Sequence, residues 1–174
     1  MSRMRQLLPL LLAAAVTIQP APADAQAGLA GSYRLDAAAS DDINQAINLA
    51  IADMNFFIRQ IARPRLRDTN QPYRSVTIGI YGRQVAFQTE KRAPIVTNAG
   101  AAPVAWTRED GETLEVSSQL EGSVLTQTYQ AEDGQRTNVF TLGANGNTLS
   151  MRVTVTSPRL PDPLTYTLRY LRVD

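Results

Sequence analysis

Residues 110–155 read DGETLEVSSQLEGSVLTQTYQAEDGQRTNVFTLGANGNTLSMRVTV, and apolar and polar side chains alternate through most of the stretch. Alternation with a period of two is the pattern of a β-strand that buries one face. Turn pairs interrupt the alternation about every 12 residues. They are Asp110-Gly111, Glu121-Gly122, Asp133-Gly134 and Asn145-Gly146. This rhythm predicts an up-and-down meander of antiparallel strands joined by short hairpins.

The period of two extends from residue 73 to the C-terminal Leu164, Tyr166, Leu168 and Tyr170. Together with a short first strand at residues 31–36, it predicts about nine or ten strands, the size at which an open twisted sheet curls or closes. We therefore expect a mainly β fold, either an up-and-down antiparallel barrel or a strongly curled sheet with an apolar inner face. Residues 91–103 are the least regular, and the sequence leaves open whether they form a loop or a broken strand.

A helical period separates the first strand from the meander. Apolar residues recur every three or four positions, which is one face of an α-helix. They are Ile43, Ala46, Ile47, Ala50, Ile51, Met54, Phe57, Ile58 and Ile61. The pattern predicts one long amphipathic helix with Ser40 as its N-cap and Pro64 as its end. We expect its apolar stripe to pack on the sheet. Its opposite face has few Lys or Arg residues, which argues against stable membrane insertion.

The N-terminus has the three parts of a secretory signal. Arg3 and Arg5 precede an apolar run at residues 7–18, and Ala23-Asp24-Ala25 matches the small-x-small cleavage pattern. We expect residues 1–25 to be a cleaved signal peptide, with cleavage after Ala27 as an alternative. Residues 26–174 would then be a single domain in the periplasm or the medium.

Composition excludes several functions. The sequence contains no Cys and no His, which removes thiol nucleophiles, the Ser-His-Asp triad and the commonest metal ligands. We predict no catalytic residue, no metal site and no cofactor. Cleavage of the signal would leave equal numbers of basic and acidic residues, and a neutral domain is a poor candidate for binding nucleic acid.

The opening Gly31-Ser32-Tyr33, the helix after the first strand and the run of hairpins resemble the lipocalin and fatty-acid-binding-protein group, the calycins. The ending at residues 157–166 resembles that of exported bacterial lipocalin-like proteins. The resemblance implies a barrel that holds a small ligand. Fatty-acid-binding proteins usually have two short helices and an Arg-x-Tyr pair on the last strand. This sequence predicts one long helix, and its last strand lacks that spacing.

Polar residues that share the inner face with apolar ones are the candidate ligand contacts, because binding pockets combine an apolar lining with a few polar groups. An Arg in such a pocket would suit a carboxylate or phosphate group. Alternatively, Arg136 and Arg172 lie at strand ends, where long side chains often reach out to water. The candidates are Ser118, Gln127, Tyr129, Arg136, Asn138, Tyr166, Tyr170 and Arg172.

These patterns favour a non-enzymatic extracytoplasmic protein that binds a small apolar or amphipathic molecule inside the sheet, under the helix. Two alternatives stay open. One is an envelope or protein-interaction module without a cavity, and the other is a cofactor-free isomerase or cyclase that uses Tyr, Arg or Glu. A cavity of about 300 Å³ or more would favour the binder or the enzyme over the filled module.

Overall fold

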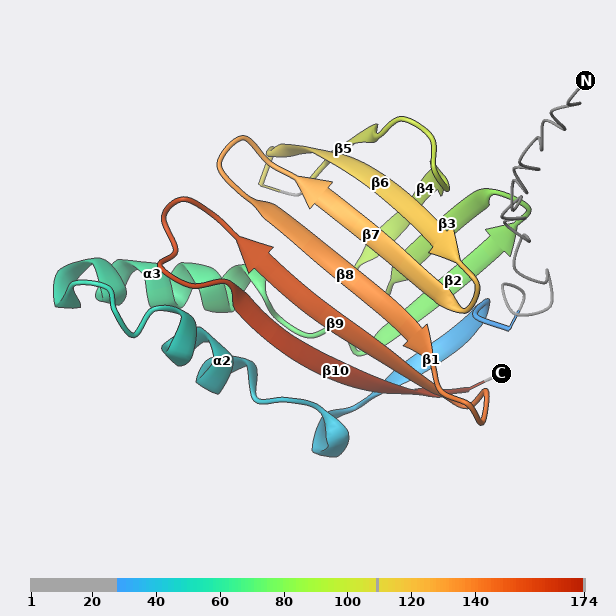
Figure 1. The fold of residues 1–174 in the computed structure, drawn as a ribbon, viewed down its shortest axis with the longest axis horizontal. Helices are drawn as coiled ribbons and strands as arrows, with labels where there is room; N and C mark the ends of the chain where they lie inside the picture. The colour runs from blue at the N-terminus through green and yellow to red at the C-terminus, as the bar shows by residue number, and fades with distance from the viewer. Residues whose placement is uncertain (1–27, 109, 174) are drawn as a thin grey trace, which may run out of the picture.

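The computed structural model of this 174-residue chain describes residues 28–108 and 110–173, so the predicted signal peptide lies outside the described residues. Ten strands follow one another in a nearly closed antiparallel barrel (Figure 1). They are β1 (Gly31–Asp36), β2 (Ser75–Tyr81), β3 (Gln84–Thr89), β4 (Arg92–Asn98), β5 (Val104–Thr107), β6 (Thr113–Glu121), β7 (Val124–Gln130), β8 (Gln135–Leu142), β9 (Thr148–Thr156) and β10 (Leu164–Arg172). This confirms the mainly β fold and the up-and-down meander.

The strand order in the sheet is β4-β3-β2-β1-β10-β9-β8-β7-β6-β5, with every neighbouring pair antiparallel. The first strand pairs with the last, so the chain wraps round on itself. The edge strand β4 contacts β6, the neighbour of the other edge strand β5. There Thr97 Oγ1 donates to Ser118 Oγ at 2.7 Å, and Gly100 N donates to the Ser118 carbonyl at 2.8 Å. These contacts bring the curled sheet near to closure.

The irregular stretch at residues 91–103 contains the edge strand β4. Its pairing with β3 shifts register between Phe87 and Thr89, opposite the segment that contains Pro94. A proline has no N–H for a sheet ladder and is tolerated on edge strands and at bulges. The structure therefore shows a strand with a break rather than a loop.

The prediction of one long helix was wrong. A short 3₁₀ turn, η1 (Ala37–Ala39), is followed by two α-helices, α2 (Ile43–Ala50) and α3 (Phe56–Thr69). Asn55 separates the helices because its side chain accepts from Phe57 N at 2.9 Å and caps α3. The structure thus has the two helices that are usual in fatty-acid-binding proteins.

Both predicted ends of the helical region were also wrong. Asp42, rather than Ser40, caps α2 by accepting from Asn44 N at 2.8 Å. The Ser40 hydroxyl instead donates to the Asp36 carbonyl at 2.7 Å and accepts from Arg169 N at 2.9 Å. Pro64 does not end α3, which continues to Thr69. Side chains after Pro64 complete the last turn, since the Thr69 hydroxyl donates to the Arg65 carbonyl at 2.9 Å.

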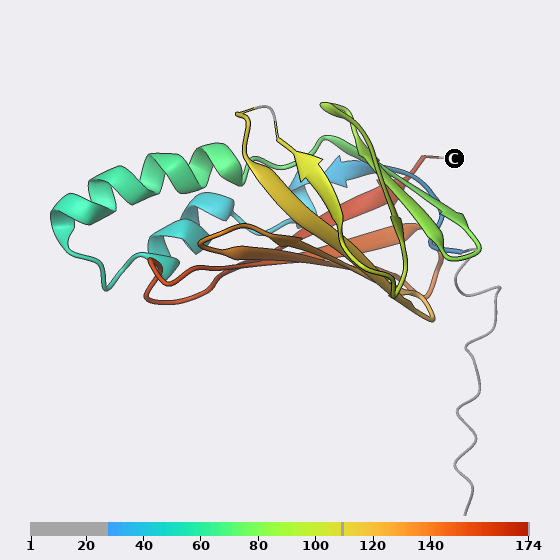
Figure 2. The same cartoon turned by 90° about the horizontal axis from the view of Figure 1, so that it is seen from above.

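Only the first half of the predicted apolar stripe is buried. Ile47, Ala50 and Ile51 are buried in the core, and α2 packs on β10. Figure 2 shows α3 extending beyond the end of the barrel. Its first turns expose Phe56, Phe57, Ile58 and Ile61, of which Phe57 is 76% exposed. The expectation that this part packs on the sheet was wrong, because the break before Asn55 redirects the chain. Within the described residues, no helix has the length and apolarity needed to cross a bilayer.

Arg172 links the start of β1 to the end of β10 at one end of the barrel. Its guanidinium donates to the carbonyls of Gly146 and Ala30, both at 2.9 Å, and to the Tyr33 hydroxyl at 2.6 Å. It also lies 4.8 Å from the centroid of the Tyr33 ring. The side chain therefore fastens the start of the first strand to the end of the last, and it does not extend into water.

Replacing Arg172 with Met should lower the free energy of unfolding by about 2 to 4 kcal/mol, because several carbonyls lose a charged donor. Equilibrium urea denaturation measures the change. Arg152→Met is the matched control, since Arg152 is exposed on β9, and it should change stability by less than about 0.5 kcal/mol. Equal effects of the two substitutions would show that Arg172 has no such role.

Candidate ligand-binding site

The register of β6 to β10 arranges the inward side chains in rows that cross the strands. The first row contains Val116, Tyr129, Arg136 and Val155. The second row contains Ser118, Gln127, Asn138, Val153 and Tyr166. The third row contains Leu120, Leu125, Phe140, Met151 and Leu168. A polar row thus separates an apolar core from the row nearest the barrel mouth.

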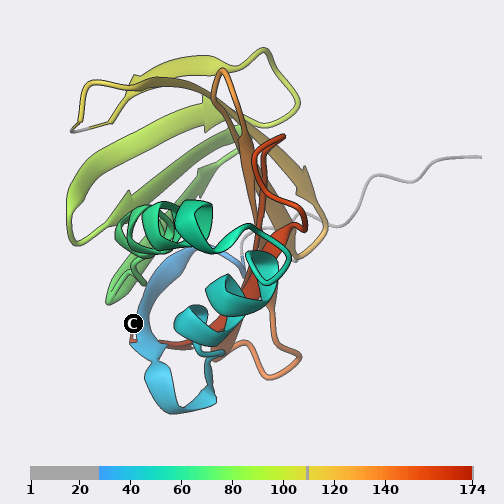
Figure 3. The same ribbon diagram turned by 90° about the vertical axis from the view of Figure 1, so that its left-hand side faces the viewer.

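A cavity of about 580 Å³ opens at this mouth, beside the C-terminal end of α3. Figure 3 views the molecule from the side on which the helices lie. Tyr129, Arg136 and Val155 of the first row line the cavity together with Tyr73 and Trp106. The cavity is large enough for a small molecule.

The cavity differs from the expected hollow under a long helix. Asp68, Thr69 and Asn70, at the end of α3, contribute to its lining, whereas α2 packs against β10. Below the polar row the interior is packed, and the rings of Phe87 and Phe140 meet across the barrel with their centroids 5.3 Å apart. A ligand would therefore occupy the mouth rather than the full length of the barrel.

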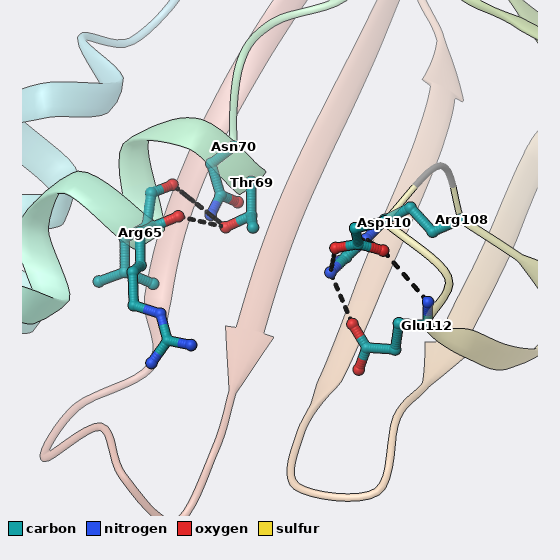
Figure 4. Close-up of polar contacts among 7 residues, drawn as sticks. Arg65, Thr69, Asn70, Arg108, Asp110 and Glu112 are labelled. Carbon is teal, nitrogen blue, oxygen red and sulfur yellow. Dashed lines mark hydrogen bonds and ion pairs between the residues drawn. The ribbon is translucent and has the colours of Figure 1, made fainter.

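Several charged residues line the opening. Figure 4 shows three of them, Arg108, Asp110 and Glu112, in contact with one another. Arg108 Nη2 contacts Glu112 at 2.6 Å, and Arg108 Nε donates to both carboxylate oxygens of Asp110 at 2.9 Å. The hydrogen bond from Arg108 lowers the pKa of Asp110 to about 2. The lining carboxylates lie at the rim, where Asp68, Asp110 and Asp133 are exposed and Glu112 is half-buried.

Arg136 lies half-buried at the floor of this cavity. Its Nε donates to Asn138 Oδ1 at 2.9 Å, its Nη1 to Asn70 Oδ1 at 3.1 Å, and its Nη2 is 3.4 Å from the Tyr166 hydroxyl. The Tyr166 hydroxyl also donates to Asn70 Oδ1 at 3.2 Å. Within the part of the chain that the structure describes, the hydrogen bonds of Arg136 go only to neutral oxygens.

The charge states of this cluster follow from its surroundings. Burial opposes the charge of Arg136, but Tyr166, Tyr73 and Tyr129 outweigh it, and the pKa of Arg136 lies above its ordinary value. Burial also raises the pKa values of Tyr129 and Tyr166. At neutral pH the floor therefore has one permanent cation and two protonated hydroxyls.

The structure brings six of the eight predicted site residues onto two neighbouring rows. They are Tyr129 and Arg136 in the first row, and Ser118, Gln127, Asn138 and Tyr166 in the second. The other two lie apart. The Tyr170 hydroxyl is buried in the core, 3.9 Å from Met151 Sδ, and Arg172 is bound at its own strand end.

Sequence reasoning missed three residues that line the cavity, Asn70, Tyr73 and Trp106. Asn70 is 2% exposed and contacts both Arg136 and Tyr166. In the sequence it is an ordinary polar residue after a helix, and no pattern pairs it with a residue 66 positions away. Only the packing of the end of α3 against the barrel mouth makes that contact.

Comparison with known proteins places this geometry in a structural class. No model of a protein family matches the sequence, and no curated protein matches it. Among solved structures, the REP1-NXSQ fatty acid transporter has a TM-score of 0.55 at 17% identity, covering 85% of this chain and 98% of its own. The chain has the fold of the fatty-acid-binding proteins.

Other structures agree with this assignment of the fold. The Schistosoma mansoni fatty acid binding protein in complex with arachidonic acid has a TM-score of 0.54 at 18% identity, covering 86% of this chain and 99% of its own. Apo Caenorhabditis elegans lipid binding protein 8 has a TM-score of 0.55 at 10% identity, covering 84% and 96%. These neighbours are named as binding or transport proteins rather than enzymes.

The rim gives a direct test of the local electrostatics. NMR titration of the Asp110 carboxyl should give a pKa of about 2, and Arg108→Gln should return it towards the ordinary Asp value of about 3.9. Because the folded-state pKa is lowered, this interaction stabilises the fold above the unfolded pKa and is lost as pH falls through about 2. Arg159→Gln, at the exposed pair with Asp133, should leave the titration unchanged. An ordinary pKa for Asp110 in the unaltered protein would contradict the contact.

Proposed function

We propose that this protein is an exported, non-enzymatic carrier of a small amphipathic anion. The apolar body of the ligand lies against Tyr73, Trp106 and Tyr129 in the mouth of the barrel, and its carboxylate or other acidic group contacts Arg136. Export follows from the N-terminal signal pattern.

The observation that carries the proposal is a half-buried guanidinium at the floor of a cavity, whose hydrogen bonds to the described residues go only to neutral oxygens. A recessed cation is costly unless it is paired, and an anionic ligand supplies the missing charge. Tyr129 and Tyr166 stay protonated at neutral pH, so neither adds a negative charge beside Arg136 that would compete with the anion.

The two alternative functions find less support. A module without a cavity does not account for the opening of about 580 Å³. An isomerase or cyclase that uses Glu beside Tyr or Arg would need that carboxylate near the floor, whereas the lining carboxylates in the described residues lie at the rim. The solved structures with this fold include a fatty acid transporter and a fatty acid binding protein in complex with arachidonic acid, which supports a small acid as the ligand.

Competition against 1-anilinonaphthalene-8-sulfonate tests the proposal. The protein should bind dodecanoate more tightly than dodecanol by about 10- to 100-fold, since a charge-assisted hydrogen bond contributes about 1.5 to 3 kcal/mol. Arg136→Met should remove most of this preference, and Arg136→Lys should retain part of it.

Arg152→Met, on the outer face of β9, is the control and should leave both affinities unchanged. Native mass spectrometry of protein purified from its own host should show a bound small acid. Failure to bind both the sulfonate dye and dodecanoate would contradict the proposal. A preference for dodecanoate over dodecanol that is unchanged in Arg136→Met would also contradict it.

A further inference from the structure

The polar row directly below the cavity is unusually well buried. Gln127 is 0% exposed and Asn138 is 1% exposed, and the two residues face each other across β7 and β8. Their neighbours along the strands towards the mouth are Tyr129 and Arg136, which also face each other and line the cavity. A group that passes the floor between Tyr129 and Arg136 therefore meets the two amides next.

Each amide uses its oxygen and leaves its nitrogen without a partner. Asn138 Oδ1 accepts from Arg136 Nε at 2.9 Å. A guanidinium nitrogen can only donate, so the oxygen must face Arg136 and Nδ2 must point elsewhere. Gln127 Oε1 accepts from the Tyr129 hydroxyl at 3.3 Å. Within residues 28–108 and 110–173, neither Asn138 Nδ2 nor Gln127 Nε2 has a hydrogen-bond partner.

The rest of the row shows the contrast. The hydroxyls of Thr97 and Ser118 continue the polar band towards β4, and they bond to each other at 2.7 Å. Buried polar groups in native proteins are almost always paired in this way. Neither amide lines the cavity itself, because Tyr129 and Arg136 lie between the amides and the mouth. The two unpaired nitrogens are therefore a site for an acceptor from outside the chain that reaches past these two side chains.

We propose that Gln127 and Asn138 form a second ligand contact, which takes an uncharged oxygen of the ligand, such as a hydroxyl or carbonyl. The inference rests on the proposed function and narrows it. While Arg136 binds the acidic group, the two amides select amphiphiles that also have an oxygen near the acidic end, inward of the apolar body. Residues two apart on a strand are about 7 Å from each other, so this oxygen lies within a few carbons of the acid.

The test compares dodecanoate with 3-hydroxydodecanoate and 5-hydroxydodecanoate, each competing with 1-anilinonaphthalene-8-sulfonate. At least one hydroxy acid should bind about 10-fold more tightly than dodecanoate. The double variant Gln127→Met, Asn138→Leu, which keeps side-chain size, should bind dodecanoate and the hydroxy acids equally. Ser118→Ala, in the same row but already paired with Thr97, should keep the preference.

Stability provides a second readout that separates a ligand contact from a structural one. In a Tyr129→Phe background, Gln127→Met removes an unpaired buried donor without leaving the Tyr129 hydroxyl unpaired, so the ligand-free double variant should be at least as stable to urea as Tyr129→Phe. If a buried water or the fold itself held the amide, the same substitution would destabilise the protein, and the inference would be overturned.

The two proposals fail in different ways. If none of the acids binds, both the proposed function and this inference fall. If the acids bind through Arg136 but the unaltered protein does not distinguish dodecanoate from its hydroxy derivatives, the carrier function stands and the second contact is wrong.

Discussion

Antiparallel register is the constraint on which the interior of this molecule depends. From β6 to β10, each inward side chain has a fixed partner on the next strand, so the interior is built in rows. A slip of one residue in a hairpin would turn a whole inward set outwards. Because the rows are in register, Tyr129 lies opposite Arg136, and Gln127 opposite Asn138. The cavity floor and the polar row beneath it both follow from that pairing.

The polar row marks the boundary between two parts of the barrel. Below it, aromatic and aliphatic side chains meet from wall to wall, and the contact between Phe87 and Phe140 closes the middle of the interior. Above it, the side chains leave an opening that is lined by aromatic rings and surrounded by charged residues. The packed half supplies stability without disulfides. The open half then keeps polar groups that a purely structural core would exclude.

The helical region has a different role from a simple lid. The cap at Asn55 divides it, α2 completes the core on β10, and the end of α3 brings Asn70 to the barrel mouth. Through hydrogen bonds, Asn70 links the helix to Arg136 and Tyr166 at the floor of the cavity. The apolar residues at the start of α3 are left on the surface. The helical region therefore has three roles. Helix α2 is part of the core, the start of α3 is exposed, and the end of α3 supports the site.

Apart from β4, the sequence by itself determined the strands, their up-and-down order and their inward faces, because a period of two and regular turn pairs are local features. It also indicated six of the residues in the first row and the polar row below it. It did not determine where the helical region breaks, since the Asn55 cap competes with a continuous apolar stripe. It could not show that Arg172 fastens the strand ends while Arg136 faces a cavity, as both look alike at a strand terminus. Only the tertiary structure decided those points, because they depend on contacts between residues far apart in the chain, such as Arg136 with Asn70 and Arg172 with Ala30.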